Sequence, residues 1–439
     1  MHGDAHAAHP RWDARRRGQA VTESGSALAE TLARDGIEVS HEGAYPIAAP
    51  ASEAEVVAIV ERAARDGLKV LPIGLGTKLD FCRPEAAEGA CDLALSMRKL
   101  RDVVAYEPGD GTLTARAGAR MGELARTVLA GGHRLTPDVP HPDEATLGGV
   151  LGASQSGPDR TRFGPVRHHV LGVRVVRSDG TIAKSGGRLV KNVTGFDLHR
   201  LYCGSRGTLC VVLEASLRLF AEPEREAALT ATYPAARPAL EAAEAVRALP
   251  IAPLAVTLEG VDEDFRLHVF LAGHSEQVRW EADEVERVLG DAERRDDEGA
   301  RCHRALVRDL GRRNGRWPAF RMVCLPSQLP SAIDSTRDFA GARGLQPRFL
   351  AQPFAGIVDV FLPGDAATEP ESFVALASEL RDLLAPAEVR LDPLAVPAAV
   401  HRALARTNDE GPAARWMTRL RESFDPAGTF ASPLFPCRA

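Results

Sequence analysis

Apolar residues first follow a regular pattern just after residue 50. Over residues 52–67 they fall on one face of a helix, where Ser52 and Glu55 form a capping box and Gly67 supplies the C-terminal stop. The apolar run 68–73 has the length of a buried strand, and it ends at a glycine loop. A helix, a strand and a glycine loop in direct succession predict an α/β unit.

Further elements follow from the same two periodicities. Alternation predicts two strands within residues 102–118, separated by a Pro-Gly-Asp-Gly turn, and residues 120–130 predict a helix that stops at paired glycines. Residues 170–182 predict one more strand. A short helix is expected near residues 26–34, whereas the rest of residues 1–44 has only a weak pattern and is expected to be partly disordered.

The pattern changes character near residue 222. Strand-like runs at 254–260 and 265–273 precede a helix over 276–289 that ends at Gly290, and the charged stretch 290–301 predicts an exposed loop. Strands that alternate with helices rich in Ala, Glu and Arg predict an α+β region with an antiparallel sheet.

Composition narrows the classes of function. The chain is 44% hydrophobic and 26% charged with a net charge of −6, which does not favour nucleic-acid binding. No apolar run approaches a membrane span, and the arginine cluster near the start is not followed by the apolar stretch of a secretory signal. We therefore expect a cytoplasmic protein, on or off the inner face of a membrane.

Cysteine and histidine usage gives no sign of a metal or disulfide framework. The seven cysteines are scattered without a CxxC pair, and the thirteen histidines include no HExxH motif. The cysteines are best explained as small apolar residues. Only five lysines occur in the whole chain, so each is more informative than any of the many arginines.

Three glycine-rich passages stand out, at residues 74–76, 148–157 and 204–207. The first fits neither GxGxxG nor the P-loop pattern, because Leu79 replaces the last glycine and Thr77 separates Gly76 from its lysine. An ordinary turn also uses glycine. Three such passages beside predicted strands, however, would let the backbone approach a large dinucleotide closely.

These motifs carry a family resemblance. The segments PIGLGTK, ATLGGVLGASQSGP, VLGVRVVRSDGTI, KNVTGFDLHRL and GSRGTLCVVLEASLRL resemble, in order and spacing, the FAD-binding domain of the vanillyl-alcohol-oxidase/p-cresol-methylhydroxylase superfamily. SFDPAGTFASP resembles the C-terminal signature of that superfamily. Within it, GGRLVKNVTGFD is most similar to the smaller FAD-binding (E) subunit of bacterial glycolate oxidase. The resemblance covers about residues 46–220 and 415–433.

The resemblance implies a fold and its division. The fold class is α+β, with a two-subdomain FAD-binding domain of the p-cresol-methylhydroxylase type and an α+β cap domain that contains an antiparallel sheet. The expected parts are an N-terminal extension, the FAD-binding domain, the cap and a C-terminal segment that returns to the FAD domain, at 1–44, 45–221, 222–412 and 413–439.

The resemblance also implies the residues that bind FAD. They are Pro72, Ile73, Gly74, Leu75, Gly76, Thr77, Lys78, Thr146, Gly148, Gly149, Ser154, Gly157, Gly207, Thr208 and Val212. Backbone amides of the first loop would form a nest for the pyrophosphate, while Val212 could equally be a packing residue. Relatives with covalent FAD carry a histidine in the first loop, and residues 72–81 contain none, so FAD is expected to be noncovalent.

Some positions depart from the family or stay ambiguous. Ser154, Asp159, His168 and Cys210 differ from the residues that relatives usually have, which leaves the local geometry open. Lys191 could favour an anionic flavin or an acid substrate. Alternatively KNVTGFD is a capped turn, in which Asp197 pairs with Lys191 or with Arg200.

No catalytic residue is identified from the sequence. Relatives that oxidise 2-hydroxy acids carry a histidine-rich metal motif of the HGGDGNxH kind, which is missing here, and His268, His274 and His303 are explained as ordinary strand or surface residues. By resemblance, the chain is expected to be an FAD-binding subunit of a glycolate or other 2-hydroxy acid oxidase, partnered by a larger FAD-containing subunit and an iron–sulfur subunit, without nucleic acid. A stand-alone oxidase of another small molecule, or a scaffolding subunit that has lost FAD, are the alternatives.

Overall fold

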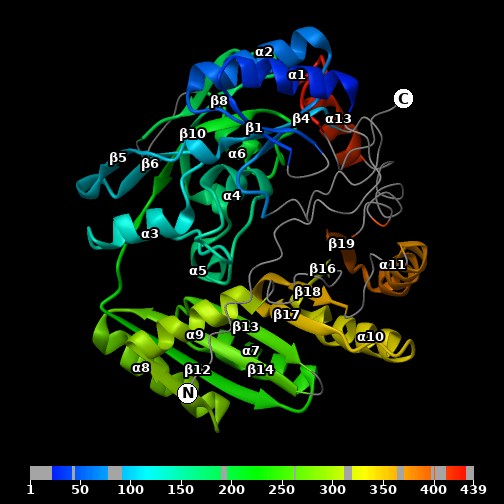
Figure 1. Cartoon of the computed structure of the whole chain (residues 1–439). Helices are drawn as coiled ribbons and strands as arrows, with labels where there is room; N and C mark the ends of the chain where they lie inside the picture. Colours follow the sequence, from blue (N-terminus) through cyan, green and yellow to red (C-terminus); the bar gives the residue numbers. More distant parts are fainter. Residues whose placement is uncertain are drawn as a thin grey trace, which may run out of the picture.

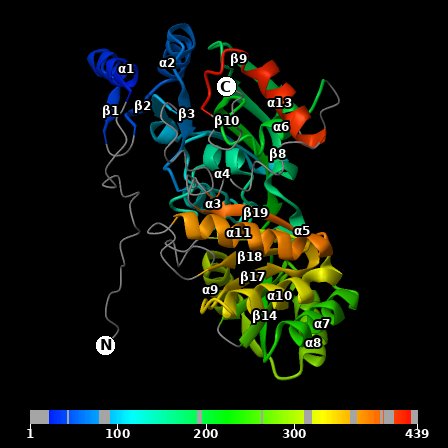
Figure 2. The ribbon, with the colours of Figure 1, turned by 90° about the vertical axis from the view of Figure 1, so that its right-hand side faces the viewer.

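Two sheets from the N-terminal half lie above one large sheet from the C-terminal half in this computed structural model (Figures 1 and 2). The structure describes residues 22–41, 45–77, 91–188, 195–261, 264–310, 319–362, 370–396, 400 and 412–431. Across these ranges, no helix combines the length and the apolar character needed to cross a lipid bilayer.

The first sheet has four strands in the order β1-β2-β4-β3, with β1 antiparallel to β2 and the other pairs parallel. Its strands and covering helices are α1 (Glu23–Arg34), β1 (Glu38–Ser40), β2 (Ile47–Ala49), α2 (Glu53–Asp66), β3 (Val70–Ile73) and β4 (Leu93–Ser96). The predicted N-cap of α2 is confirmed, since the Ser52 hydroxyl accepts from the Glu55 amide, and Gly67 ends the helix at φ 67°. The Glu55 carboxylate accepts from the Ala51 amide at 2.7 Å instead of from the Ser52 amide of a complete capping box.

The second sheet has five antiparallel strands in the order β5-β6-β10-β8-β9. The elements of this part, including a small β7/β11 pair, are β5 (Val103–Glu107), β6 (Thr112–Arg116), α3 (Met121–Leu129), β7 (His133–Arg134), α4 (Leu147–Ala153), α5 (Arg160–Phe163), β8 (Val170–Val176), β9 (Ile182–Gly186), α6 (Leu198–Tyr202), β10 (Val211–Arg218) and β11 (Phe220–Ala221). Apolar residues of α3 and α4 pack on one face of this sheet.

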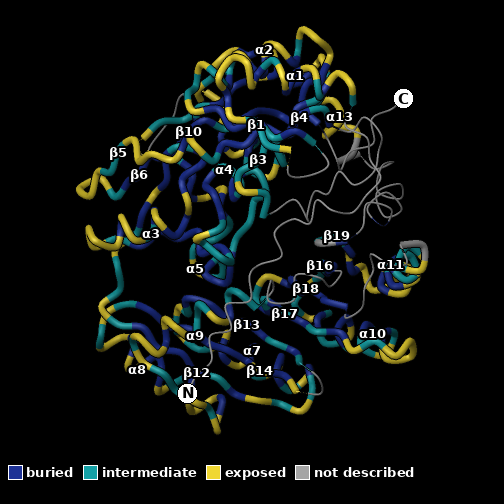
Figure 3. Tube along the Cα trace, in the orientation of Figure 1, coloured by how far each residue is buried: buried dark blue, intermediate teal, exposed yellow. Residues whose placement is uncertain are grey.

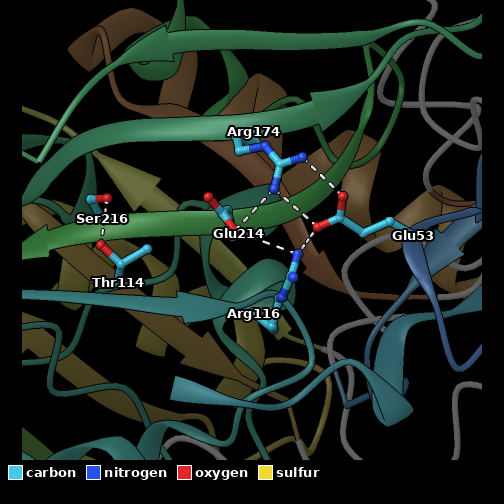
Figure 4. A network of polar contacts seen from close by, with 6 residues as sticks. All are labelled: Glu53, Thr114, Arg116, Arg174, Glu214 and Ser216. Atoms are coloured by element: carbon cyan, nitrogen blue, oxygen red, sulfur yellow. Dashed lines mark hydrogen bonds and ion pairs between the residues drawn. The ribbon is translucent and has the colours of Figure 1, made fainter. Parts of the chain in front are cut away.

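A charge network joins the two N-terminal sheets (Figure 4). Glu53, at the start of α2, pairs with Arg116 of β6 and accepts two hydrogen bonds from Arg174 of β8, at 3.0 and 2.9 Å. Glu214 of β10 lies 3.3 Å from Arg174 and 3.4 Å from Arg116. Two cations and two anions alternate, so the half-buried charges balance one another, and α2 is held against the second sheet.

The C-terminal end of the described chain pairs with the first sheet. After α13 (Pro412–Phe424), the backbone of Val70 in β3 donates to Thr429 and accepts from Ala431, both at 2.8 Å. Asp425 fixes this return by accepting from the amides of Thr429 and Phe430. The residues before the glycine loop are therefore held from two ends of the sequence.

The third sheet has eight strands in the order β15-β12-β14-β13-β17-β18-β16-β19, and the predicted antiparallel arrangement is confirmed at every pair described. Its elements are β12 (Arg225–Tyr233), α7 (Ala236–Ala248), β13 (Ala255–Val261), β14 (Asp264–Gly273), α8 (Ser275–Leu289), β15 (Glu293–Asp296), α9 (Asp297–Asp309), β16 (Ala319–Val323), α10 (Leu329–Gly341), β17 (Arg348–Gln352), β18 (Ile357–Phe361), α11 (Pro370–Leu384) and β19 (Arg390–Ala395). The domain limits given above stay predictions.

The eight-stranded sheet has two unlike faces. Alternate strand residues such as Leu267 and Val269 form a large core with α7, α8, α10 and α11. The strand residues that point to the opposite face, such as Phe270, pack against Ala300 and Val307 of α9. Figure 3 shows the strands mostly buried and the outer sides of the covering helices exposed. Helix α9 therefore lies on the face that is turned toward the N-terminal sheets.

Two sequence predictions are wrong. Residues 170–182 form a hairpin rather than one strand, because Asp179 accepts from Thr181 and Gly180 turns the chain at φ 83°. The predicted loop 290–301 contains β15 and the start of α9. The many charged residues of this stretch make its helical pattern hard to recognise. The buried positions of the amphipathic helix α9, Ala300 and Val307, are seven residues apart.

Four buried charges and the largely buried Arg304 connect α9 to the N-terminal half. We call this set the interface network: Arg134, Asp138, Asp159, Glu226 and Arg304. Arg304 of α9 donates to Asp159 at 3.0 Å and lies 3.4 Å from Glu226. Arg134 pairs with the same glutamate. Asp138 accepts from the Asp159 amide at 3.1 Å, but neither Oδ1 atom of these two aspartates has a hydrogen-bond partner among the described residues.

Burial, together with the neighbouring Asp159 carboxylate, raises the pKa of Asp138 well above its usual range, although Arg304 opposes the shift. A proton on Asp138 leaves two cations and two anions in the interface network. The folded chain then binds one more proton than the unfolded chain, so stability falls as pH rises from about 4, the unfolded pKa, through the raised folded pKa.

We therefore predict that Asp138→Asn changes the free energy of unfolding at pH 7 by less than about 1 kcal/mol, or increases it, because the amide keeps the neutral form and the shape. The decline in stability between pH 4 and the raised pKa should become shallower. Urea unfolding of both proteins across this pH range measures this. A loss of several kcal/mol at pH 7 would instead mean that Asp138 is ionised and paired with Arg304.

Candidate functional site

The first glycine loop follows β3 and exposes bare backbone. Ser96 donates to the Gly74 carbonyl at 2.9 Å, and Gly76 has a left-handed φ of 77°. The amides of Leu75 and Gly76 donate to no residue that the structure describes. A Cβ on Gly74 would overlap the hydroxyl of Thr146, so only glycine allows this approach.

The second glycine passage forms α4, which Thr146 caps. The hydroxyl of Thr146 accepts from the Gly149 amide at 3.3 Å, and the Gly148 amide donates to Ala117 at 2.8 Å. A Cβ on Gly148 would lie 2.9 Å from that of Ala117. Since both glycine amides are already engaged, these glycines provide close approach rather than free hydrogen-bond donors.

The third passage closes the site from the side of α4. The amides of Gly204 and Arg206 donate to Leu151 and Gly152, at 2.9 and 2.8 Å, and satisfy carbonyls at the C-terminal end of α4. A Cβ on Gly207 would lie 3.2 Å from the ring of Pro72 in β3. The three passages therefore contact one another, although some 130 residues of chain separate the first from the last.

These three passages surround one pocket. Most of the sequence-predicted residues line it: Pro72, Ile73, Gly74, Leu75, Gly76, Thr77, Thr146, Gly148, Gly149, Gly207 and Val212. The sequence did not single out the remaining lining residues as ligands: Leu71, Met97, Ala117, Gly152, Ala153, Ser205, Arg206, Cys210 and Val211. Gly152 could have been found, because it lies one helical turn after Gly148 and shares its face. Met97 and Ala117 carry no sequence signal.

Three predicted residues do not line the pocket, and one lies outside the described residues. Ser154 ends α4 in a left-handed conformation, and Thr208 donates to the Ser205 carbonyl at 2.7 Å. Gly157 faces Asp138, because a Cβ there would lie 2.8 Å from its carboxyl carbon. Lys78 is the residue that is not described, and so are Lys191 and most of KNVTGFD.

Some departures from the family pattern have a local explanation. Asp159 is the buried carboxylate that accepts a hydrogen bond from Arg304 in the interface network. Cys210 lines the pocket, and burial raises the pKa of its thiol, so it is an unreactive small residue. His168 is exposed. Asp197 lies 3.5 Å from Arg200, as one of the two proposed pairings expected.

A polar cluster in the eight-stranded sheet was missed by sequence reasoning. His268 Nδ1 and His303 Nε2 lie 3.1 Å apart, and Thr230 Oγ1 lies 3.1 Å from each. Glu259 is 3.5 Å from the other ring nitrogen of His268. Burial and the neighbouring His268 lower the pKa of His303 to about 4, so His303 is neutral at pH 7.

One member of this cluster departs from the prediction, because His303 lies in helix α9 and is half-buried, so it is neither a strand nor a surface histidine. His268 lies in strand β14, as one of the two expected settings, and is almost fully buried. His274, in contrast, is an exposed residue paired with Glu224, as expected for a surface histidine. Within the described ranges, no group of three or more His, Cys, Asp or Glu side chains is arranged to hold a metal ion.

Comparison with known proteins indicates the cofactor of this chain. Residues 46–186 match the FAD binding domain family. The glycolate oxidase subunit GlcD of Bacillus subtilis is 30% identical over 49% of this chain and 45% of its own length. The glycolate oxidase subunit GlcE of Escherichia coli is 33% identical over 39% of this chain and 47% of its own length.

Two more comparisons extend this picture. A probable mitochondrial D-lactate dehydrogenase of Danio rerio is 32% identical over 49% of this chain and 43% of its own length. The matches to these curated relatives thus span less than half of each relative. A solved alkyldihydroxyacetonephosphate synthase shares the fold, with a TM-score of 0.67 at 16% identity over 90% of this chain and 77% of its own.

The pocket is compatible with FAD. The amides of Leu75 and Gly76 donate to no described residue, and a Cβ on the lining residue Gly152 would meet nothing closer than 4.0 Å. Gly74, Gly148 and Gly207 let the backbone passages converge around this space. All the glycines concerned, except Gly207, lie within the matched region. The match of residues 46–186 to the FAD binding domain family supports FAD as the cofactor of this chain.

Proposed function

We propose that this chain is the FAD-binding subunit of a complex that oxidises glycolate or a related 2-hydroxy acid. The observation that carries the proposal is the glycine-walled pocket, most of whose lining lies within residues 46–186, the part that matches the FAD binding domain family. The similarity to two proteins named as glycolate oxidase subunits supports the choice of substrate. Bound FAD would supply the acceptor for the two electrons that leave the hydroxy acid. The protein contributes the binding and orientation of that cofactor.

The residues that hold FAD in this proposal are those of the pocket. The free amides of Leu75 and Gly76 form the nest for the diphosphate, as predicted for this loop. Thr146, Gly148, Gly149 and Gly207 allow the cofactor to approach the backbone. Val212 closes the wall next to them. The other three predicted residues have a positioning role in this proposal, because each holds a turn beside the pocket: Ser154, Gly157 and Thr208.

The attachment of FAD is noncovalent in this proposal. The described lining of the pocket contains no histidine or tyrosine, and burial raises the pKa of its one thiol, Cys210. Acid precipitation of the purified protein should therefore release all flavin absorbance into the supernatant. Flavin that stays with the washed pellet would show a covalent bond and contradict this part of the proposal.

A substitution that fills the pocket without straining the fold tests its location. A Cβ on Gly152 meets nothing closer than 4.0 Å, so Gly152→Leu projects its side chain into the pocket from a helix that tolerates leucine. We predict that FAD occupancy falls by at least 10-fold while the far-ultraviolet spectrum is unchanged, because the lost contacts exceed about 1.4 kcal/mol.

Gly341→Leu provides the matched control. Gly341 is also a helical glycine with open space around it, but it lies in α10, away from the pocket. Its variant should keep the flavin content of the parent protein. If Gly152→Leu also binds FAD at full stoichiometry, the cofactor lies elsewhere and the proposed site is wrong.

The alternative of a scaffolding subunit that has lost FAD is not favoured. It was motivated by the unusual residues Asp159, His168 and Cys210. The structure gives the first a buried arginine partner and the third a packing role beside an open pocket, and neither obstructs the site. These departures are therefore compatible with a chain that still binds FAD.

The partner subunits remain part of the proposal. A larger FAD-containing subunit and an iron–sulfur subunit would supply the substrate-oxidising residues and the route for electrons. The sequence supports this, because it lacks the histidine-rich metal motif of relatives that oxidise 2-hydroxy acids. The Glu259–His268–His303 cluster is the one observation that favours the second candidate, a stand-alone oxidase with its own base.

Activity of the isolated chain separates these two candidates. With FAD bound, the purified protein should reduce an artificial dye with glycolate or D-lactate at less than about 1% of a typical 10 s⁻¹ turnover. Addition of the larger flavin subunit should restore the rate. Full turnover by the chain alone, abolished by His303→Gln, would establish the stand-alone oxidase instead.

A further inference from the structure

Arg206 is held in a strained conformation beside the pocket. Its φ is 54°, in the left-handed region that non-glycine residues rarely adopt. In the same short turn, Gly204 and Gly207 have φ values of 86° and 78°. Glycine would therefore satisfy the backbone at position 206 as it does at the two neighbouring positions. The presence of arginine, at a cost in strain, points to a use for its side chain.

Arg206 is the one residue with a charged side chain among the described residues that line the pocket. Its guanidinium makes no hydrogen bond or ion pair with any residue that the structure describes. The backbone is fixed, however, because the Arg206 amide donates to the Gly152 carbonyl at 2.8 Å. The chain thus anchors an unpartnered cation at the wall of a site that is otherwise apolar or weakly polar.

We propose that Arg206 is the counter-ion of the FAD diphosphate and determines the affinity for the cofactor. This inference rests on the proposed location of FAD in this pocket. The diphosphate is the part of FAD that carries full negative charge in every oxidation state. The free amides of Leu75 and Gly76 supply only partial positive charge, and no carboxylate of the described lining competes for the guanidinium.

A structural role would predict a different response to substitution. If Arg206 only held the turn, its replacement by glycine would remove the left-handed strain and leave the cofactor site intact. If it binds the diphosphate, the same replacement should stabilise the protein without FAD and weaken FAD binding. The two effects have opposite signs, so a single variant separates the two roles.

The test is a fluorescence titration of FAD-free protein with FAD, together with the melting temperature of the FAD-free form. Arg206→Gly should raise that melting temperature by about 1–2 °C and weaken FAD binding by about 10-fold or more. Arg206→Met should weaken binding equally, and Arg206→Lys by less. Added salt should weaken FAD binding by the parent protein more than FAD binding by Arg206→Met, because the contact that the variant lacks is ionic.

Glu388→Gly is the matched control. Glu388 has the same φ of 54°, is exposed and lies after α11, away from the pocket. The melting temperature of Glu388→Gly should rise by about as much as that of Arg206→Gly, whereas its FAD affinity should be unchanged. The midpoint potential of the bound flavin should also be unchanged in Arg206→Met, since the charge of the diphosphate is the same whether the flavin is oxidised or reduced.

The outcomes distinguish this inference from the proposed site. If Arg206→Met binds FAD like the parent while Gly152→Leu does not, the pocket is right and the role of Arg206 is wrong. A change of flavin potential at unchanged affinity would place the guanidinium at the ring and would also overturn the inference. If Gly152→Leu binds FAD normally, the location of the site itself fails.

Discussion

The structure depends on the close approach of three backbone segments that carry almost no side chains where they meet. Gly74 faces Thr146, Gly148 faces Ala117 and Gly207 faces Pro72, each at a distance that leaves little or no room for a Cβ. Since the segments belong to different elements, their convergence requires both N-terminal sheets to be in place. The charge network around Glu53 and the return of Thr429–Ala431 to β3 provide that positioning. The pocket is thus a consequence of backbone packing, and its few polar groups are added to it.

A second constraint acts between the two halves of the chain. Helix α9 lies on the inner face of the eight-stranded sheet, and its Arg304 reaches two carboxylates, one from each half. Buried ion pairs are weak evidence of net stabilisation, but they do fix relative position, because an unpaired charge is costly. Asp138 precedes α4, and Asp159 lies between α4 and α5. The eight-stranded sheet and its helix α9 are therefore in direct contact with residues that flank the pocket helix α4.

Much of this arrangement could be predicted from local sequence. The cap at Ser52, the stop at Gly67 and the glycine passages express local rules of helix ends and turns, and the structure has them where the sequence indicated. Helix α9 was missed because charge obscured its periodicity. The turn at Gly180 was missed although Ser178, Asp179 and Gly180 are typical turn residues. The pairing of His268 with Thr230 and His303 depends on the register of β12 and β14, which local sequence does not specify. Likewise Met97 and Ala117 reach the pocket through tertiary packing alone.

The central claim is that FAD binds where the glycine passages converge. A crystal structure of the purified protein with FAD tests it most directly. The account predicts diphosphate oxygens within hydrogen-bond distance of the amides of Leu75 and Gly76, with the guanidinium of Arg206 on the same group. FAD bound at the Glu259–His268–His303 cluster or at any other surface, with the glycine-walled pocket empty, would contradict it.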